Sequence, residues 1–235
     1  MDEKAQKLLA EMLHGARLAF SNAEQLCREG EVLAKEGCFP RALFLHQISL
    51  EECAKVDMIG TWATNLLVGG GVDVERMAKA FRSHEAKNYS NAYMAAATQD
   101  EKEARKRGDN QAAVEAFQSL QKQFHKDSNT AKNAALYVDF RDSGFVAPTD
   151  VITKEAARGT WAVNVYFLDL TAPKIRLLER MQNDPGALGT TAKWFIDKSE
   201  ALRKLKADEM DSALAELMQE MVKRHIEGQS QAGKK

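Results

Sequence analysis

The chain has 235 residues, of which 44% are hydrophobic, and its formal net charge is −1. This length and composition predict a globular protein with a sizeable buried core, built as one large domain or two small ones. The near-zero charge excludes a global electric field that would attract nucleic acid or an anionic membrane, so binding to either would need a local patch.

The cysteines and the apolar segments indicate the cellular compartment. Cys27, Cys38 and Cys53 form no CxxC pair, which favours free thiols in a reducing compartment over a disulfide framework or a zinc site. The N-terminal segment is charged and lacks the apolar core of a signal peptide. No stretch offers the roughly 18 uninterrupted apolar residues of a membrane span. We therefore expect a cytoplasmic protein that makes no contact with a membrane.

The first part of the chain predicts a helical hairpin. Apolar residues recur at helical spacing from residue 2 to about residue 36, and Gly37 ends this pattern. A second helix is predicted from Pro40 to Val68, with the glycine run Gly69–Gly71 as its stop. Its apolar residues cover more than one stripe, which is typical of a helix buried on several sides. We expect it to return antiparallel to the first helix.

The middle of the chain predicts two further helices separated by a charged run. Asp73 is placed to cap a third helix, which we expect to continue to about Thr98. The charged segment Gln99–Gly108 is typical of a solvated turn or helix end. A fourth helix is predicted from about Asn110 to Ala135.

The last part begins with the stretch LYVDFRDSGFVAP, about residues 136 to 148, which carries aromatic residues and turn signals. We expect this extended aromatic loop to pack onto the bundle. A fifth helix from about Asp150 should be broken or kinked near Pro173. Additional C-terminal helices follow it. The predicted fold class is therefore all-α, with a helical bundle over residues 1–182 and a C-terminal helical extension over residues 183–235 packed on the same domain.

Three charged residues stand out in the second predicted helix. Glu51 and Glu52 precede Lys55 by four and three positions, so both carboxylates can reach one ammonium. Charges inside a helical core are costly unless they are paired, and they concentrate at functional sites. Two interpretations stay open: a functional cluster, or a structural ion pair at the rim of the helix with Lys55 reaching water.

The same helix carries an Arg-x4-His string, Arg41 to His46. Arginine can hold a phosphate and histidine can exchange protons near neutral pH. Together they could cleave RNA without a metal, the histidine moving a proton while the arginine stabilises the charge on phosphorus. Five helical positions turn through about 140°, so the side chains do not stack directly. The alternative is structural, with Arg41 capping the hairpin and His46 hydrogen-bonded in the core.

A third candidate pair is His84 with Lys87, three positions apart on the third predicted helix. Because this helix follows the second through a glycine turn, the pair could face Glu51, Glu52 and Lys55. The cluster would then hold two carboxylates, two ammoniums and an imidazole in one groove.

Di-metal carboxylate bundles repeat a Glu-x-x-His motif on paired helices, but Glu11 to His14 is a single such string, so no metal site is predicted. Glycine-rich phosphate loops are absent, so no nucleotide cofactor is predicted.

The segments that carry these charged residues, together with the aromatic stretch, resemble the AbiV family of bacterial abortive-infection proteins. The resemblance rests on FPRALFLHQISLEECAKVDMIG, then FRSHEAK, then ALYVDFRDSGFVAP, in this order over about residues 5–170. It implies an HEPN-like antiparallel helical bundle that serves in anti-phage defence, often as a dimeric, metal-independent ribonuclease. The family's motif positions fall here on Glu51, Glu52, Lys55, His84, Lys87, Tyr137 and Asp139.

Two functional hypotheses follow from this resemblance. The first is a homodimeric abortive-infection effector that cleaves or binds RNA, with His84 or His46 as acid or base. Arg41, Lys55 and Lys87 would face phosphate, and Glu51 and Glu52 would orient them. The alternative is a non-catalytic helical module that binds a phage-encoded protein or a partner toxin, in which the charged cluster only holds the helices in register.

Overall fold

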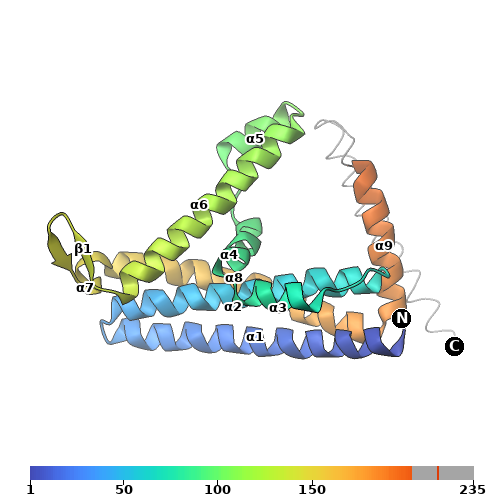
Figure 1. Cartoon of the computed structure of the whole chain (residues 1–235), viewed down its shortest axis with the longest axis horizontal. Coiled ribbons are helices and arrows are strands. Elements are labelled where there is room, and N and C mark those ends of the chain that lie inside the picture. The colour runs from blue at the N-terminus through green and yellow to red at the C-terminus, as the bar shows by residue number, and fades with distance from the viewer. Residues whose placement is uncertain (203–215, 217–235) are drawn as a thin grey trace. The chain divides into compact units, whose positions relative to one another are not determined.

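The computed structural model describes residues 1–202 and residue 216 of the chain, and it confirms the all-α fold class (Figure 1). None of the helices in that part of the chain is long and apolar enough to cross a membrane. The chain divides into two compact units. The first combines Met1–Ala96 with Gln118–Gly189, and the second combines Ala97–Phe117 with Thr190–Lys235. All the candidate site residues belong to the first unit.

Three long helices form the body of the first unit: α1 (Glu3–Lys35), α2 (Phe39–Leu67) and α8 (Lys154–Asn183). Each packs against the other two, and in Figure 1 they run lengthwise beside one another. The turn between α1 and α2 places Gly37 at φ 76°, a left-handed conformation that glycine adopts without steric cost. The predicted helical hairpin is therefore confirmed.

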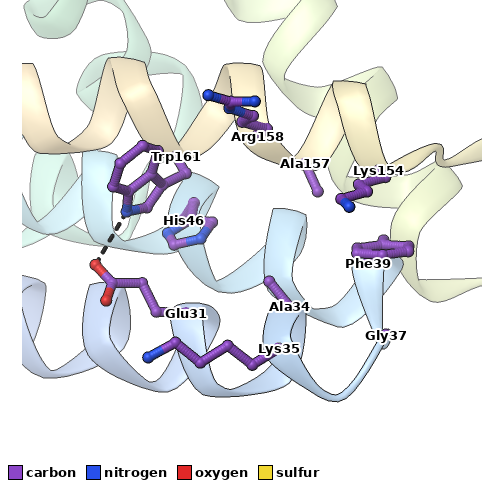
Figure 2. A pocket seen from close by; sticks show the side chains of 10 residues that line it. All are labelled: Glu31, Ala34, Lys35, Gly37, Phe39, His46, Lys154, Ala157, Arg158 and Trp161. Atoms are coloured by element: carbon purple, nitrogen blue, oxygen red, sulfur yellow. Dashed lines mark hydrogen bonds between the residues drawn. The ribbon is translucent and has the colours of Figure 1, made fainter.

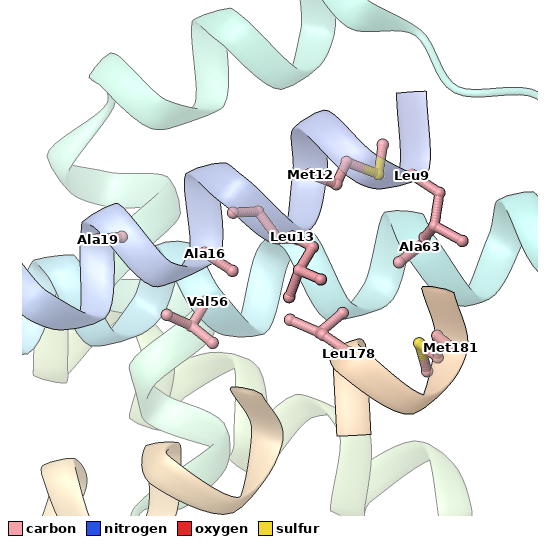
Figure 3. Close-up of a cluster of buried hydrophobic side chains, with 10 residues drawn as sticks. Leu9, Met12, Leu13, Ala16, Ala19, Val56, Ala63, Leu178 and Met181 are labelled. Carbon is pink, nitrogen blue, oxygen red and sulfur yellow. The ribbon is translucent and has the colours of Figure 1, made fainter. Parts of the chain in front are cut away.

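The core between these helices is built from interlocking aliphatic and small side chains. Small residues such as Ala16 and Ala63 let the helix backbones approach closely, and Leu13, Val56 and Leu178 fill the space between them (Figure 3). Full burial of one such aliphatic side chain contributes about 1.5–3 kcal/mol to the free energy of unfolding. The site residues on α2 are thus carried by a rigid, well-packed helix.

One expectation about helix continuity is wrong, and a second is answered in part. The third predicted helix is interrupted at Ser83, which separates α3 (Val74–Arg82) from α4 (His84–Asn91). Ser83 ends α3 in an extended conformation, and its hydroxyl caps α4 by accepting the Ala86 amide hydrogen at 3.1 Å. Helix α8 is not broken at Pro173 and continues to Asn183, whereas a kink at Pro173 stays a prediction. A 3₁₀ turn, η1 (Ala92–Met94), follows α4.

The charged run after residue 98 is a helix rather than a solvated turn. Helix α5 (Gln99–Lys106) begins at Thr98, whose hydroxyl accepts the Glu101 amide hydrogen. Glu101 also pairs with Arg105 one turn later at 2.7 Å, and such i,i+4 pairs stabilise a helix whose sequence is mostly charged. Helix α6 (Asn110–Leu136) follows, close to its predicted bounds.

The predicted extended segment forms a two-stranded antiparallel hairpin of β1 (Asp139–Arg141) and β2 (Gly144–Val146), followed by the one-turn α7 (Pro148–Val151). The expectation that its aromatic side chains pack onto the bundle is wrong. Phe140 and Phe145 contact each other with ring centroids 5.1 Å apart, yet they are 60% and 81% exposed. Tyr137 and Val138 are also mostly exposed.

The C-terminal section begins as the helix α9 (Pro185–Leu202). The remainder of the predicted extension, residues 203–215 and 217–235, lies outside the described residues. Its packing on the bundle, and the domain division at residue 183, stay predictions.

Candidate functional site

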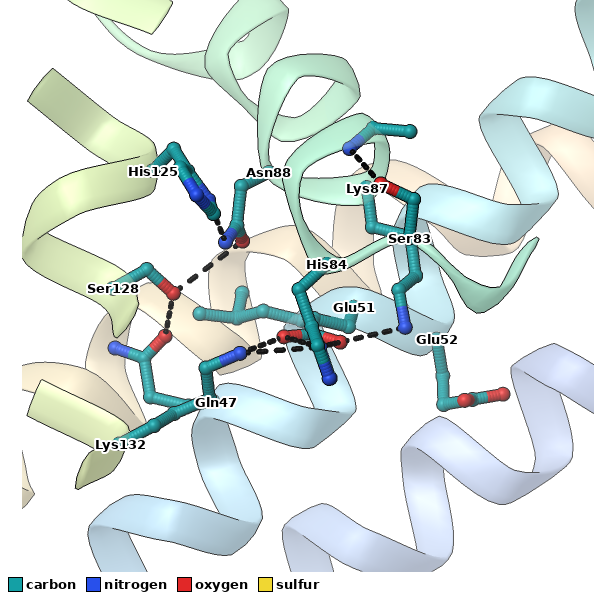
Figure 4. A network of polar contacts seen from close by, with 12 residues as sticks. Gln47, Glu51, Glu52, Ser83, His84, Lys87, Asn88, His125, Ser128 and Lys132 are labelled. Carbon is teal, nitrogen blue, oxygen red and sulfur yellow. Dashed lines mark hydrogen bonds and ion pairs between the residues drawn. The ribbon is translucent and has the colours of Figure 1, made fainter. Parts of the chain in front are cut away.

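The candidate site is centred on the carboxylate of Glu51, in the middle of α2 and only 1% exposed. Two other helices direct cationic or ionisable side chains at it (Figure 4). From α4, His84 Nδ1 lies 2.7 Å from Oε2, and Lys87 Nζ lies 2.7 Å from the same oxygen. From α6, Lys132 Nζ contacts Oε1. Three elements far apart in the sequence therefore meet at one buried carboxylate.

Glu51 is ionised in this arrangement. Burial by itself would raise the pKa of the carboxyl group, but hydrogen bonds and charge from Lys132 and Lys87 outweigh it, so the pKa lies below its ordinary value. An ionised carboxylate accepts hydrogen bonds and donates none. A hydrogen bond from His84 to Glu51 therefore requires the proton on Nδ1 of His84, although Lys132 Nζ also lies 3.2 Å from this nitrogen.

This hydrogen bond determines the tautomer of His84. With the proton on Nδ1, the other ring nitrogen, Nε2, is left with a free lone pair in the neutral ring. The His84 side chain is 56% exposed, whereas that of Glu51 is 2% exposed. A buried carboxylate thus holds an accessible imidazole in one orientation, which is the arrangement that a histidine base requires. His84 is also the first residue of α4, and the Ser83 cap fixes the start of that helix.

The cluster carries an excess of positive charge. Lys87 and Lys132 have side-chain exposures of only 8% and 6%, and they share the single charge of Glu51. Both ammoniums pair with this one carboxylate, so the three side chains together carry one net positive charge. Buried unpaired charge is costly, and a bound anion such as a phosphate would lower that cost. An anion bound to these ammoniums would lie beside the His84 imidazole.

A neutral network supports the same surface. Asn88 Oδ1 lies 3.3 Å from Ser128 Oγ, and the Ser128 hydroxyl donates to Gln47 Oε1 at 2.8 Å. On its other side, Asn88 Nδ2 lies 3.2 Å from Nδ1 of His125. These contacts join α2, α4 and α6 next to Glu51 (Figure 4). They hold the helices that carry His84 and Lys132 in a fixed register.

Glu52 and Lys55 form a separate pair. Lys55 Nζ lies 2.6 Å from Glu52 Oε1, as the three-residue spacing predicts. Among the described residues, Lys55 forms no ion pair with Glu51, whose oxygens are occupied by groups from α4 and α6. Of the predicted cluster, the structure therefore joins Glu51, His84 and Lys87, with Glu52 and Lys55 adjacent on the same helix.

Arg41 and His46 do not meet. Arg41 is exposed at the start of α2, and its Nη1 donates to the Leu136 carbonyl oxygen at the end of α6 at 3.4 Å. His46 is 1% exposed, with Nδ1 3.2 Å from Nδ2 of Asn164 on α8. Burial lowers the pKa of His46 below its ordinary value, partly opposed by Glu31. A phosphate could not touch both side chains of this string in the observed arrangement.

The two predicted residues near the aromatic hairpin lie apart from the cluster. Tyr137 is exposed, and Asp139 pairs with Arg141 at 2.8 Å on the same strand. Hydrogen bonds from Arg141 and from the Phe140 amide lower the pKa of Asp139. In the described part of the chain, neither residue forms a hydrogen bond or ion pair with Glu51 or its partners.

Sequence reasoning missed the contribution of α6. Lys132 is as close to Glu51 as Lys87 is, and Ser128 and His125 join the surrounding network. The spacing of these three residues, three and four positions apart, could have indicated this contribution, because it places them on one face of a helix. Among the described residues, no group of three or more His, Cys, Asp or Glu side chains is arranged to hold a metal ion.

Comparison with known proteins places this site within a family. The AbiV-type HEPN family profile matches residues 11–164, which include the whole Glu51 cluster. The chain is 36% identical over 115 residues to the uncharacterized protein y4gJ of Sinorhizobium fredii (strain NBRC 101917 / NGR234). That match covers 49% of this chain and 60% of the relative, less than two thirds of its length. No solved structure matches the chain significantly. The chain belongs to the AbiV family of HEPN proteins.

Proposed function

We propose that the protein is an anti-phage abortive-infection effector that cleaves RNA without a metal ion. The family supports the defence role. The observation that carries the chemistry is the contact between His84 Nδ1 and the buried Glu51 carboxylate, which leaves the second ring nitrogen on an exposed side chain. The excess charge of Lys87 and Lys132 beside it favours a phosphate of the RNA backbone.

The reaction uses the 2′-hydroxyl of the RNA as the nucleophile. His84 Nε2 takes the proton from this hydroxyl, and the 2′-oxygen forms a new bond to phosphorus as the bond to the 5′-oxygen breaks. Water protonates the departing 5′-oxygen, and His84 returns its proton to solvent. The products are a 2′,3′-cyclic phosphate and a 5′-hydroxyl end. Glu51 acts as a positioning residue that keeps the imidazole in one tautomer, and the ammoniums stabilise the charge on phosphorus.

The direct test is cleavage of total RNA by purified protein in EDTA, read on a sequencing gel. Wild type is expected to cleave and His84→Ala to lose at least a hundredfold in rate, because general base catalysis contributes about 10²–10⁴-fold. His14→Ala is the matched control, since His14 is an exposed histidine on α1 outside the cluster. Circular dichroism must show that both variants are folded.

The outcome can also contradict the proposal. If wild type leaves RNA intact in EDTA, with magnesium and with phage lysate, the ribonuclease is excluded. Equal cleavage by His84→Ala and His14→Ala would remove His84 from the mechanism. A homodimer, which the sequence analysis predicts, is tested in the same preparation by sedimentation velocity.

A second function is favoured by a different observation, the exposed hairpin. Phe140 and Phe145, whose rings meet edge to face, present aromatic surface to solvent next to the exposed Tyr137 and Val138. Exposed aromatic groups of this kind are typical of protein interaction sites. Under this alternative the protein is a non-catalytic module that binds a phage-encoded protein through the hairpin, and the Glu51 cluster only holds α2, α4 and α6 together.

A further inference from the structure

A second concave site lies on α2 away from the Glu51 cluster. A cavity of about 500 Å³ is formed where the end of α1, the start of α2 and the start of α8 come together (Figure 2). His46 lines this cavity with groups from α1 and α8, whereas the partners of Glu51 come from α4 and α6. A volume of this size is typical of sites for small organic molecules.

The walls combine aromatic and cationic side chains. Phe39 and Trp161 supply aromatic rings, and Lys35, Lys154 and Arg158 supply three positive charges. In the part of the chain that the structure describes, none of these three cations forms an ion pair. Cations with no carboxylate partner around an aromatic-lined cavity favour an anionic ligand with a flat ring.

The one carboxylate of the cavity is already engaged. Glu31 Oε1 accepts a hydrogen bond from Trp161 Nε1 at 2.9 Å, and this bond fixes the indole ring at the edge of the cavity. Glu31 therefore orients the aromatic wall and leaves the cavity with a net positive charge, since three cations outnumber it. The ligand's ring would lie against Trp161 while its anionic group meets Arg158 and Lys154.

The deep wall of the cavity is preorganised. The His46 ring is nearly fully buried, and Asn164 holds its Nδ1. Gly30 on α1 gives the ring its space, because a Cβ atom there would lie 2.7 Å from His46 Cε1. Buried polar side chains that hold each other in place make a rigid wall, which lowers the entropic cost of binding a ligand.

We infer that this cavity binds a small aromatic anion, with its ring against Trp161 and its charged group on Lys154 and Arg158. The anionic group can be a phosphate or a carboxylate, since both accept the parallel hydrogen bonds of a guanidinium. The site is separate from the RNA-cleaving chemistry proposed above and does not depend on it.

Isothermal titration calorimetry on the full chain tests this inference. The probes are 1-naphthyl phosphate and 1-naphthoate, with 1-naphthalenemethanol as the uncharged analogue and inorganic phosphate as the anion without a ring. At least one aromatic anion should bind more tightly than both controls. The preferred probe then distinguishes a phosphate ligand from a carboxylate ligand.

Two variants on α8 assign the binding to this cavity. Arg158→Glu should weaken binding of the preferred probe at least tenfold. Arg176 is an exposed arginine on the same helix outside the cavity, so Arg176→Glu should leave the binding affinity unchanged. Both side chains are exposed, so neither change should unfold the protein. The inference is overturned if no aromatic anion binds at millimolar concentration, if the uncharged analogue binds equally well, or if Arg158→Glu and Arg176→Glu bind the probe equally.

Discussion

Glu51 and His46 lie five residues apart on α2, and their surroundings differ. Glu51 is an ionised carboxylate that collects two buried ammoniums and an exposed histidine from α4 and α6. His46 is a buried ring held by Asn164 from α8 and packed against Gly30 of α1. Five helical positions turn the two side chains toward different neighbours. Of these two histidines, His84 remains accessible because its carboxylate partner is buried, whereas the ring of His46 is itself buried.

The largest effect is expected from removing the charge at Glu51. Glu51→Gln keeps the shape of the side chain but leaves the ammoniums of Lys87 and Lys132 buried without an anion. Breaking a buried ion pair in this way costs about 3–5 kcal/mol of unfolding free energy. Urea denaturation at pH 7 measures the loss.

The matched control for that substitution is Glu52→Gln on the same helix. Glu52 pairs only with Lys55, whose side chain is 24% exposed, and partly solvated pairs contribute about 1 kcal/mol or less. If the two variants unfold at the same urea concentration, the buried positive charge around Glu51 does not destabilise the protein. The proposed attraction of an anion to the site would then be contradicted.

A smaller effect is expected at the His46 centre. Gly30→Ala would place its new methyl group 2.7 Å from the His46 ring, and overpacking a buried site costs about 1–3 kcal/mol. Gly15→Ala on the same helix is the control, because its nearest atom would be Ile59 Cδ1 at 3.8 Å. There the better helix propensity of alanine should stabilise the protein by about 0.5–1 kcal/mol. Thermal unfolding that moves both variants in the same direction would contradict the tight packing around His46.

The two centres should also lose stability in different pH windows. The pKa of His46 is lowered on folding from 6.5, so the unfolded chain binds the proton first and stability falls as the pH drops below about 6.5. The pKa of Glu51 is lowered from 4.5, so its contribution is present above that value and is lost only at lower pH. Urea midpoints from pH 8 to pH 3 should show both declines. His46→Gln should remove the first, and Glu51→Gln the second.

The sequence predicted much of this arrangement, but it could not predict the partners of each charge. Helical spacing located α1, α2 and α6 closely, and the glycine turn after the second predicted helix suggested that His84 and Lys87 could face Glu51. Spacing along α2 also suggested that Glu51 would reach Lys55. Tertiary packing decided otherwise, because α4 and α6 offer ammoniums on the face where Glu51 lies. Local periodicity cannot show which distant helix will cover a face.

The break at Ser83 shows a second limit of the sequence. Serine is compatible with a helix interior, so the apolar pattern on both sides predicted one continuous helix. Its hydroxyl competes with the backbone and caps α4 instead. This break places His84 in the first turn of a new helix, facing Glu51. Helical periodicity therefore did not predict the helix break at Ser83, which places His84 at the start of α4.

The smallest effect on stability is expected at the hairpin. Phe145→Ser should change the unfolding free energy by no more than about 0.5 kcal/mol, because the side chain is 81% exposed and only its contact with Phe140 is lost. Differential scanning fluorimetry measures this, with Phe167→Ser as the contrasting control, since Phe167 is 3% exposed in the core and should destabilise strongly. A folded Phe145→Ser protein that still cleaves RNA but no longer protects cells from phage would assign the hairpin to recognition of a partner. If protection is unchanged, the exposed aromatic pair has no part in defence. The proposed function then depends on the contact between Glu51 and His84 alone.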